Sequence, residues 1–257
     1  MIAFPEEIYP LLSQAVWQFL IVFLRVGAVV SVMPAFGERT IPMRIKLTIA
    51  LVFTLIVAPA APAMPAPGDV LDLSLLIVSE TIVGLALGLG IRLFVLALQT
   101  AGSIAAQSTS LAQILGGAGV EPIPALGYIL VVSGLALAVM SGLHVLAAQM
   151  LIGSYLAFPV GIAVDAAVLT EWGAARVARA FSLAFTLAAP FVIASLIYNL
   201  TLGAINRAMP QLMVAFVGAP VITWGALFLL FLAAPTILVI WVEALMVFFH
   251  DPTGYNR

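Results

Sequence analysis

Five ionisable side chains lie inside long apolar stretches of this sequence, where either chemistry or a structural contact must account for them. They are Arg25, Glu80, Arg92, His144 and Glu243. A charge at the centre of a membrane helix costs about 2.5–3.5 kcal/mol, so each should have a partner or a polar cavity. Glu80 and Arg92 are separated by about 18 Å along one helix, which is too far for them to pair with each other. We therefore expect their partners on other segments or on other chains.

These ionisable residues have two interpretations. Acids and bases aligned along one pathway would form a relay for protons or substrate. Alternatively, they lie near the ends of segments or at contacts between subunits. We favour the second interpretation, because the acids and bases do not repeat on one helical face.

The sequence carries no recognisable set of catalytic or metal-binding residues. His144 has no HxxxH or ExxH pattern around it, so a structural histidine is favoured over a metal ligand. The chain has no Cys, which excludes thiol catalysis and Cys-ligated metals. There is no GxSxG motif, and no second His supports a catalytic triad. We therefore expect no enzyme activity, no metal and no cofactor.

The segment at residues 199–220 places polar side chains between two apolar stretches. Pro210 lacks an N–H group and disfavours helix at the residue before it, so a continuous helix through this point is not expected. The backbone amides of a broken helix cannot be satisfied by lipid and must face protein or water. No catalytic partner is visible here. We interpret the segment as a structural corner that joins two hairpins and contacts neighbouring subunits, formed by Asn199, Asn206, Arg207, Pro210 and Gln211.

A second unusual segment, at residues 99–124, is polar but uncharged until Glu121. Its glycines permit backbone conformations that are closed to other residues. It does not match a phosphate-binding loop, which would need a Lys-Ser/Thr pair after the last Gly. The residues alone leave two alternatives equally open: an ordinary loop between helices, or a flexible insertion that lines or closes an aqueous lumen. The residues of interest are Leu111, Gly116, Gly117, Ala118, Gly119, Glu121 and Pro122.

The composition indicates the elements that must position these residues. The chain of 257 residues is 64% hydrophobic and 8% charged, with a mean hydropathy of +1.25. A soluble domain has about 25% charged residues, so this chain belongs in a bilayer or in a membrane complex. The net charge of −2 gives no sign of nucleic-acid binding. The acidic N-terminus, MIAFPEEIYP, lacks the basic region of a cleavable signal peptide.

Six apolar segments are predicted, at roughly residues 11–36, 45–63, 73–99, 124–150, 178–205 and 212–249. Each of the first five is long enough to span a bilayer. The last would be about 57 Å long as one straight helix. We expect Pro220 and Pro235 to break or kink it, and it could form a helical hairpin. Gly84 and Gly88 share one helix face, a pattern typical of close helix packing. The expected fold is an all-α membrane protein with one domain over residues 1–257.

Several short motifs occur together in an order that resembles the FliR/SctT family, the export-gate subunit of flagellar and injectisome type III secretion. The strongest match is Leu202-Gly203 and Asn206-Arg207-Ala208-Met209-Pro210-Gln211, followed by Gly218-Ala219-Pro220. A second is Gly142-Leu143-His144, followed by Ser154-Tyr155 and Pro159-Val160-Gly161. A third begins at Arg25 and continues with Pro34-Ala35-Phe36-Gly37, Ile41-Pro42 and Lys46. The Gly218-Ala219-Pro220 ending resembles the flagellar branch more than the injectisome branch.

This resemblance implies a function in protein export through the bacterial inner membrane, at the flagellar basal body. One copy would assemble with FliP-like and FliQ-like chains into a closed helical assembly of kinked hairpins. A FlhB-like switch protein would associate with this gate, and unfolded flagellar proteins would pass through it. A loop of the subunit would plug the pore, and residues 111–124 are the matching candidate. The alternatives are the equivalent injectisome subunit and an independent secondary transporter of small solutes, although the inverted repeat that is usual in such transporters is missing.

Overall fold

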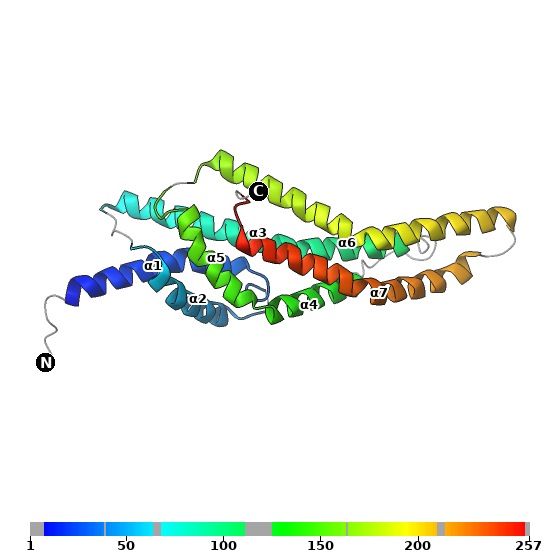
Figure 1. Ribbon diagram of the computed structural model, residues 1–257, viewed down its shortest axis with the longest axis horizontal. Coiled ribbons are helices and arrows are strands. Elements are labelled where there is room, and N and C mark those ends of the chain that lie inside the picture. The colour runs from blue at the N-terminus through cyan, green and yellow to red at the C-terminus, as the bar shows by residue number, and fades with distance from the viewer. Residues whose placement is uncertain are drawn as a thin grey trace. The chain divides into compact units, whose positions relative to one another are not determined.

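The computed structural model describes residues 8–38, 40–63, 68–110, 125–162, 164–209 and 214–254, and contains helices but no strand within these ranges (Figure 1). The elements are α1 Ile8–Val32, α2 Met43–Val57, the short 3₁₀ helix η1 Ala58–Ala60, α3 Val70–Ser110, α4 Ala125–Met140, α5 Leu143–Ala157, α6 Ala166–Ala208 and α7 Val214–His250. Five of the described helices are long and apolar enough to cross a membrane, or six if the bent pair α4 and α5 is one span. The predicted all-α membrane fold is confirmed.

The described chain divides into two compact units, which several long helices share. The first unit comprises Met1–Arg92, Val139–Arg176 and Met246–Arg257, and the second comprises Leu93–Ala138 and Val177–Leu245. Each unit is described by itself below. That the whole chain forms one domain stays a prediction.

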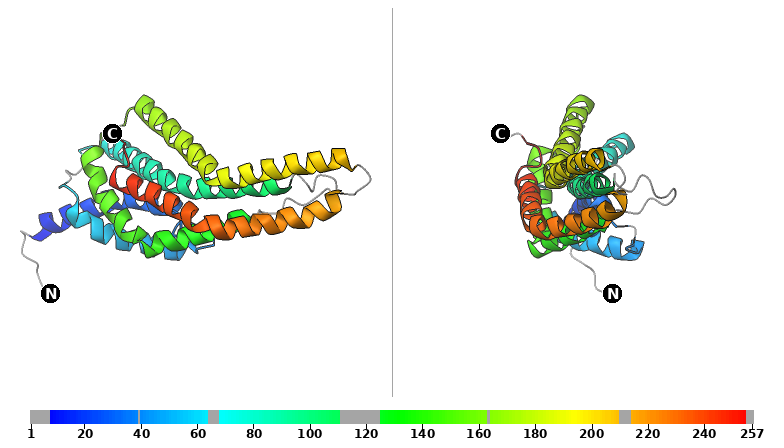
Figure 2. Two further views of the ribbon diagram at one scale, coloured as in Figure 1. Left: turned by 45° about the vertical axis from the view of Figure 1, so that its right-hand side comes forward. Right: turned by 90° about the vertical axis from the view of Figure 1, so that its right-hand side faces the viewer.

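In the first unit, α1 and α2 lie side by side (Figures 1 and 2). The side-chain amide of Gln18 on α1 donates to the carbonyl oxygen of Ala58, just after α2, at 2.7 Å. Lys46 Nζ on α2 donates to the carbonyl oxygen of Gly37, in the turn between the two helices, at 2.9 Å. A side chain at Gly37 would collide with the backbone, because a Cβ there would lie 2.8 Å from the carbonyl oxygen of Met33. A lysine and a glycine from the motifs quoted above therefore hold this turn.

In the second unit, α3 and α4 meet backbone to backbone. A Cβ on Gly102 of α3 would lie 2.6 Å from the backbone nitrogen of Gly127 of α4. Further along, the indole Nε1 of Trp241 on α7 donates to the carbonyl oxygen of Phe94 on α3 at 2.7 Å. Trp241 also lies next to Gly134 of α4, where a Cβ would meet the indole ring at 3.4 Å. Glycines therefore allow the close approach of α3 and α4. The hydrogen bond of the Trp241 indole joins α7 to α3.

Helix α3 extends further than the apolar run predicted. The polar stretch from residue 99 was expected to be a loop or insertion, yet its first part continues the helix to Ser110. Hydroxyl groups in this stretch can bond to the helix itself, as Ser108 Oγ does to the carbonyl oxygen of Ala105 at 2.8 Å. A polar side chain that binds its own helix in this way does not need to leave it. The prediction of loop structure over residues 99–110 is wrong.

The fourth apolar segment, predicted as one run over 124–150, is a broken helix. Helix α4 ends at Met140, and α5 begins at Leu143. Gly142 lies between them with φ of +84°, in the left-handed region that glycine adopts without strain. Hydropathy alone cannot detect this break, because the helices on both sides are apolar.

In the last apolar segment, a break was predicted where the structure has a continuous helix. Pro220 and Pro235 were expected to break or kink it, and a hairpin was considered, but α7 is one helix from Val214 to His250, without a break. Pro190 likewise lies inside α6. In membrane helices, neighbouring groups and small local adjustments compensate for the missing N–H of proline. Helix α6 also begins earlier than predicted, at Ala166 instead of residue 178.

Candidate functional site

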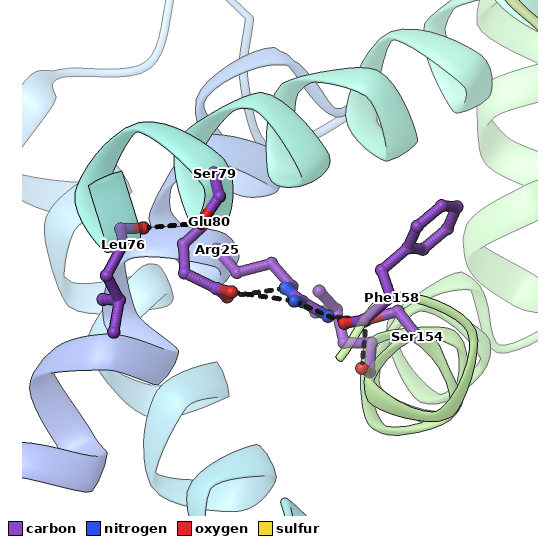
Figure 3. A network of polar contacts seen from close by, with 7 residues as sticks. Arg25, Leu76, Ser79, Glu80, Ser154 and Phe158 are labelled. Carbon is purple, nitrogen blue, oxygen red and sulfur yellow. Dashed lines mark hydrogen bonds and ion pairs between the residues drawn. The ribbon is translucent and has the colours of Figure 1, made fainter. Parts of the chain in front are cut away.

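Two of the predicted intramembrane charges pair with each other inside the first unit (Figure 3). Arg25 Nε on α1 donates to Glu80 Oε2 on α3 at 2.8 Å, and Arg25 Nη2 donates to Glu80 Oε1 at 3.0 Å. The two side chains are only 0% and 1% exposed. This bidentate arrangement matches the planar guanidinium to the carboxylate. Each charge is therefore neutralised by a partner on another segment, as the sequence predicted.

The same guanidinium binds the C-terminal end of α5. Arg25 Nη1 donates to Ser154 Oγ at 3.0 Å, and Nη2 donates to the carbonyl oxygen of Phe158 at 2.8 Å. Ser154 Oγ in turn donates to the carbonyl oxygen of Leu151 at 2.7 Å. The guanidinium carbon also lies 3.9 Å from the ring centroid of Tyr155. A cation at the carbonyl end of a helix is electrostatically favourable. One buried arginine thus joins α1, α3 and α5.

Helix α3 reaches α1 through a row of residues spaced by four, namely Glu80, Gly84, Gly88 and Arg92. Residues four apart lie above one another on a helix face. A Cβ on Gly84 would lie 2.7 Å from the Cβ of Ala28, and a Cβ on Gly88 would lie 3.0 Å from the carbonyl oxygen of Val29. The glycine pair was expected to support close helix packing, and its partner is α1 of the same chain. The close approach brings the Glu80 carboxylate within reach of Arg25.

Arg92 lies at the far end of this row. Its Nη1 donates to the carbonyl oxygen of Val32, the last residue of α1, at 3.3 Å. The carbonyl groups at the end of a helix lack partners within the helix, so a basic side chain there is stabilising. Glu80 and Arg92 are too far apart to pair, but each of them contacts α1, at Arg25 and at the carbonyl oxygen of Val32.

The other two predicted intramembrane residues, His144 and Glu243, form no hydrogen bond or ion pair with Arg25 or Glu80. His144 on α5 and Glu243 on α7 are both exposed. Among the residues that the structure describes, neither side chain has a hydrogen-bond partner. They do not join Arg25 and Glu80 in a common polar pathway.

The predicted corner is partly described. Helix α6 ends at Ala208 and Met209 is no longer helical, so the helix ends before Pro210, as expected. Asn206 and Arg207 are exposed in the last turn of α6. Asn199 Nδ2 donates to Ser195 Oγ at 3.1 Å, and Ser195 Oγ donates to the carbonyl oxygen of Ser108 at the end of α3. Pro210 and Gln211 lie outside the described residues.

The candidates for a pore plug also lie outside the described residues. They are Leu111, Gly116, Gly117, Ala118, Gly119, Glu121 and Pro122. The described structure stops at Ser110 on one side of the segment and resumes at Ala125 on the other.

A second polar contact, which the sequence did not reveal, lies where α6 meets the chain end in the first unit. Trp172 Nε1 and Arg176 Nη2 both donate to the carbonyl oxygen of Pro252, each at 3.0 Å. The Arg176 guanidinium also lies 5.2 Å from the ring centroid of Phe248. The only signal in the sequence was that Arg176 is a charge near an apolar run. Nothing local linked it to a proline 76 residues away.

Among the described residues, no three or more of His, Asp and Glu gather where a metal ion could bind. The described arrangement neutralises charges and fixes helices. It does not place an acid, a base and a nucleophile around an open space.

Comparison with known proteins identifies the family. The family described as "Bacterial export proteins, family 1" matches residues 16–247. The chain is also 36% identical over 227 residues to the flagellar biosynthetic protein FliR of Caulobacter vibrioides, which covers 87% of this chain and 90% of that protein. The chain belongs to the FliR family.

Other FliR proteins match over similar lengths. The identity is 30% over 203 residues with FliR of Escherichia coli, covering 77% of this chain and 76% of that protein. It is 30% over 211 residues with FliR of Bacillus subtilis, covering 79% and 80%. The resemblance to the FliR/SctT family, with the flagellar branch favoured, is therefore confirmed.

The site partly explains the motifs that suggested the FliR family. Arg25 and the Ser154-Tyr155 pair come from two separate motifs, and the structure brings them together around one guanidinium. Neither the sequence spacing nor the residue types indicated that these motifs meet. The carbonyl oxygen of Phe158 could not have been found from the sequence, because any residue supplies such a group.

Proposed function

We propose that this chain is a subunit of the flagellar type III protein export gate in the bacterial inner membrane, where it serves the flagellar basal body. The observation that carries the proposal is the alignment with flagellar FliR proteins over most of their length. The helices long and apolar enough to cross a membrane support a multi-pass location. The substrates would be unfolded flagellar proteins.

The chain would act as a structural component and not as an enzyme. Its partners would be FliP-like and FliQ-like subunits, with a FlhB-like switch protein associated with the gate. Large apolar side chains are exposed along α6 and α7, including Phe185, Leu200, Trp224 and Phe231. Surfaces of this kind suit lipid or the apolar faces of other membrane chains.

Within the gate, the Arg25–Glu80 pair would be a structural joint and not a proton relay. A relay needs groups that change protonation and exchange protons with water. Both side chains are almost completely buried, and the guanidinium makes four hydrogen bonds. Removing either charge would leave the other unpaired, which is costly in a buried position.

The segment at residues 111–124 is the proposed pore plug. Its glycines and its low charge suit a loop that closes an aqueous path without binding ions. The contact of Gly102 with Gly127 holds α3 and α4 together near the point where this segment joins α4. Asn199, Asn206, Arg207, Pro210 and Gln211 would form the corner that contacts neighbouring subunits.

Co-purification tests the proposed function. The tagged full-length chain is produced in a bacterium that lacks its own FliR, and motility and export of flagellar proteins are measured. We expect both to be restored. We also expect the purified complex to contain one copy of this chain together with other export subunits, counted by native mass spectrometry. A chain that purifies alone, does not restore motility and takes up solutes in reconstituted vesicles would instead indicate a secondary transporter.

A further inference from the structure

Glu243 is an exposed carboxylate on the outer face of α7. Trp241 fixes the rotation of the helix at this level, because its indole donates to the carbonyl oxygen of Phe94 and its side chain is 1% exposed. Successive residues turn by about 100° around a helix, so Glu243 points about 200° away from Trp241. Leu245, two residues further on, is buried again. The orientation of Glu243 away from the helix contacts is therefore set by its buried neighbours.

The surface around this carboxylate is apolar. Val239 and Val247 lie one turn before and one turn after Glu243 on the same face, and they are 54% and 46% exposed. Ile240, three residues before Glu243, is also exposed. A row of valines and isoleucine alone would suit lipid, but an ionised carboxylate among them would not.

Two other charged residues in apolar stretches have partners within the chain. Glu80 forms a bidentate ion pair with Arg25, and Arg92 donates a hydrogen bond to the last carbonyl oxygen of α1. Glu243 has no hydrogen-bond partner among the described residues. Anionic lipid phosphates repel a carboxylate, whereas a guanidinium or ammonium group on another protein would neutralise it.

We infer that the α7 face formed by Val239, Ile240, Glu243 and Val247 binds an apolar helix of a neighbouring protein chain that brings an Arg or Lys side chain to Glu243. This inference rests on the proposed function, because it needs a multi-subunit assembly. Beyond the proposed function, it names the face of α7 that contacts another chain and the charge that the other chain carries there. The valines and isoleucine supply the packing surface, and the ion pair fixes the register of the two helices.

The experiment compares Glu243→Gln, Glu243→Leu and Glu243→Lys in the full-length chain, co-expressed with the other export subunits. We expect Lys to lower the recovery of the partner at least tenfold, because it places two like charges together. Leu should lower it less, and Gln least, since an amide can still accept a hydrogen bond. A photo-cross-linking residue at Val239 should yield an adduct with another protein chain. A compensating Arg/Lys→Glu change at the cross-linked helix should restore recovery for Glu243→Lys.

Two controls separate this interface from folding and from net charge. Glu243 is exposed and has no hydrogen-bond partner among the described residues, so the melting temperature of each variant purified alone should equal that of the unsubstituted chain. The same changes at Glu171, an exposed acid in the first turns of α6, should leave recovery unchanged. Equal recovery for all Glu243 variants, equal losses at Glu171, or cross-links to lipid only would each overturn the inference. If the unsubstituted chain recovers no export subunit, the proposed function fails instead.

Discussion

At the scale of single residues, the main result is that Arg25 makes several different contacts at once. Arg25 neutralises Glu80, binds the carbonyl oxygen at the end of α5 through Phe158 and stacks against Tyr155. A lysine could not replace it, because an ammonium group cannot present two parallel N–H donors to a carboxylate while a third binds elsewhere. The site therefore depends on the shape of the guanidinium as well as on its charge.

This dependence predicts how the pair responds to substitution. Glu80→Leu should lower the free energy of unfolding by about 3–5 kcal/mol, because it leaves Arg25 buried without a counter-charge. The double change Arg25→Met with Glu80→Leu should lower it less than Glu80→Leu alone, since no unpaired charge remains. Melting of the purified chain in detergent measures both. Glu171→Leu, at an exposed acid, is the matched control and should change little. A double variant that is no more stable than Glu80→Leu alone would contradict the view that the unpaired charge causes the loss.

At the scale of helices, glycines mark the places where two helices pack closely. Gly84 and Gly88 admit α1, and Gly102 meets Gly127 where α3 contacts α4. Gly84, Gly88 and Gly102 all lie on α3, and each lacks a side chain where the backbone of another helix passes. Close contact of this kind replaces the hydrophobic driving force, which is weak between helices in lipid.

The Gly102 contact gives a direct test. Gly102→Ala should lower the free energy of unfolding by about 1–3 kcal/mol or more, as expected for overpacking, because the added methyl group meets backbone atoms that cannot rotate away. Gly225→Ala is the matched control: it lies within α7 with no atom within 4 Å of the added Cβ. That change should leave stability equal or raise it by up to about 1 kcal/mol, through better helix propensity. Equal effects of the two changes on the melting temperature would contradict the proposed tight crossing.

At the scale of the whole molecule, the described helices expose a surface that suits lipid or the apolar faces of other membrane chains. Large apolar side chains are exposed on its described helices, and Glu243 lies exposed among them. Membership of the FliR family agrees with a chain whose surfaces are completed by lipid and by other export subunits. Its function is therefore best tested in the assembled gate.

The proposed plug makes a prediction at this scale. Deleting residues 116–119 should raise the ion conductance of the assembled, reconstituted gate, because the loop would no longer close the pore. Deleting residues 64–67, in the Pro/Ala-rich connector between α2 and α3, removes a segment of equal length and should not raise it. Conductance is measured across a planar bilayer, with subunit recovery as the check that the gate has assembled. Unchanged conductance after the first deletion would contradict the plug.

The sequence by itself determined the class of the protein, most of its apolar segments and its family. These properties depend on composition and on the order of short motifs, which can be read along one chain. It also predicted correctly that the helix breaks near Pro210 and that Glu80 needs a partner on another segment. It was wrong about a break at Pro220 or Pro235 and about residues 99–110, because the tolerance of a helix for proline or serine depends on what surrounds it.

Only the tertiary structure decided which groups meet. Arg25 and Glu80 are 55 positions apart, and Arg25 and Ser154 are 129 apart. No periodicity connects residues at such distances, because their pairing depends on how α1, α3 and α5 pack. The same packing gives Gly84 and Gly88 their partner. In the second unit, the contact of Trp241 with Phe94 turns Glu243 outward. Residue types set which contacts were chemically possible, and the close approach of the helices selected those that form.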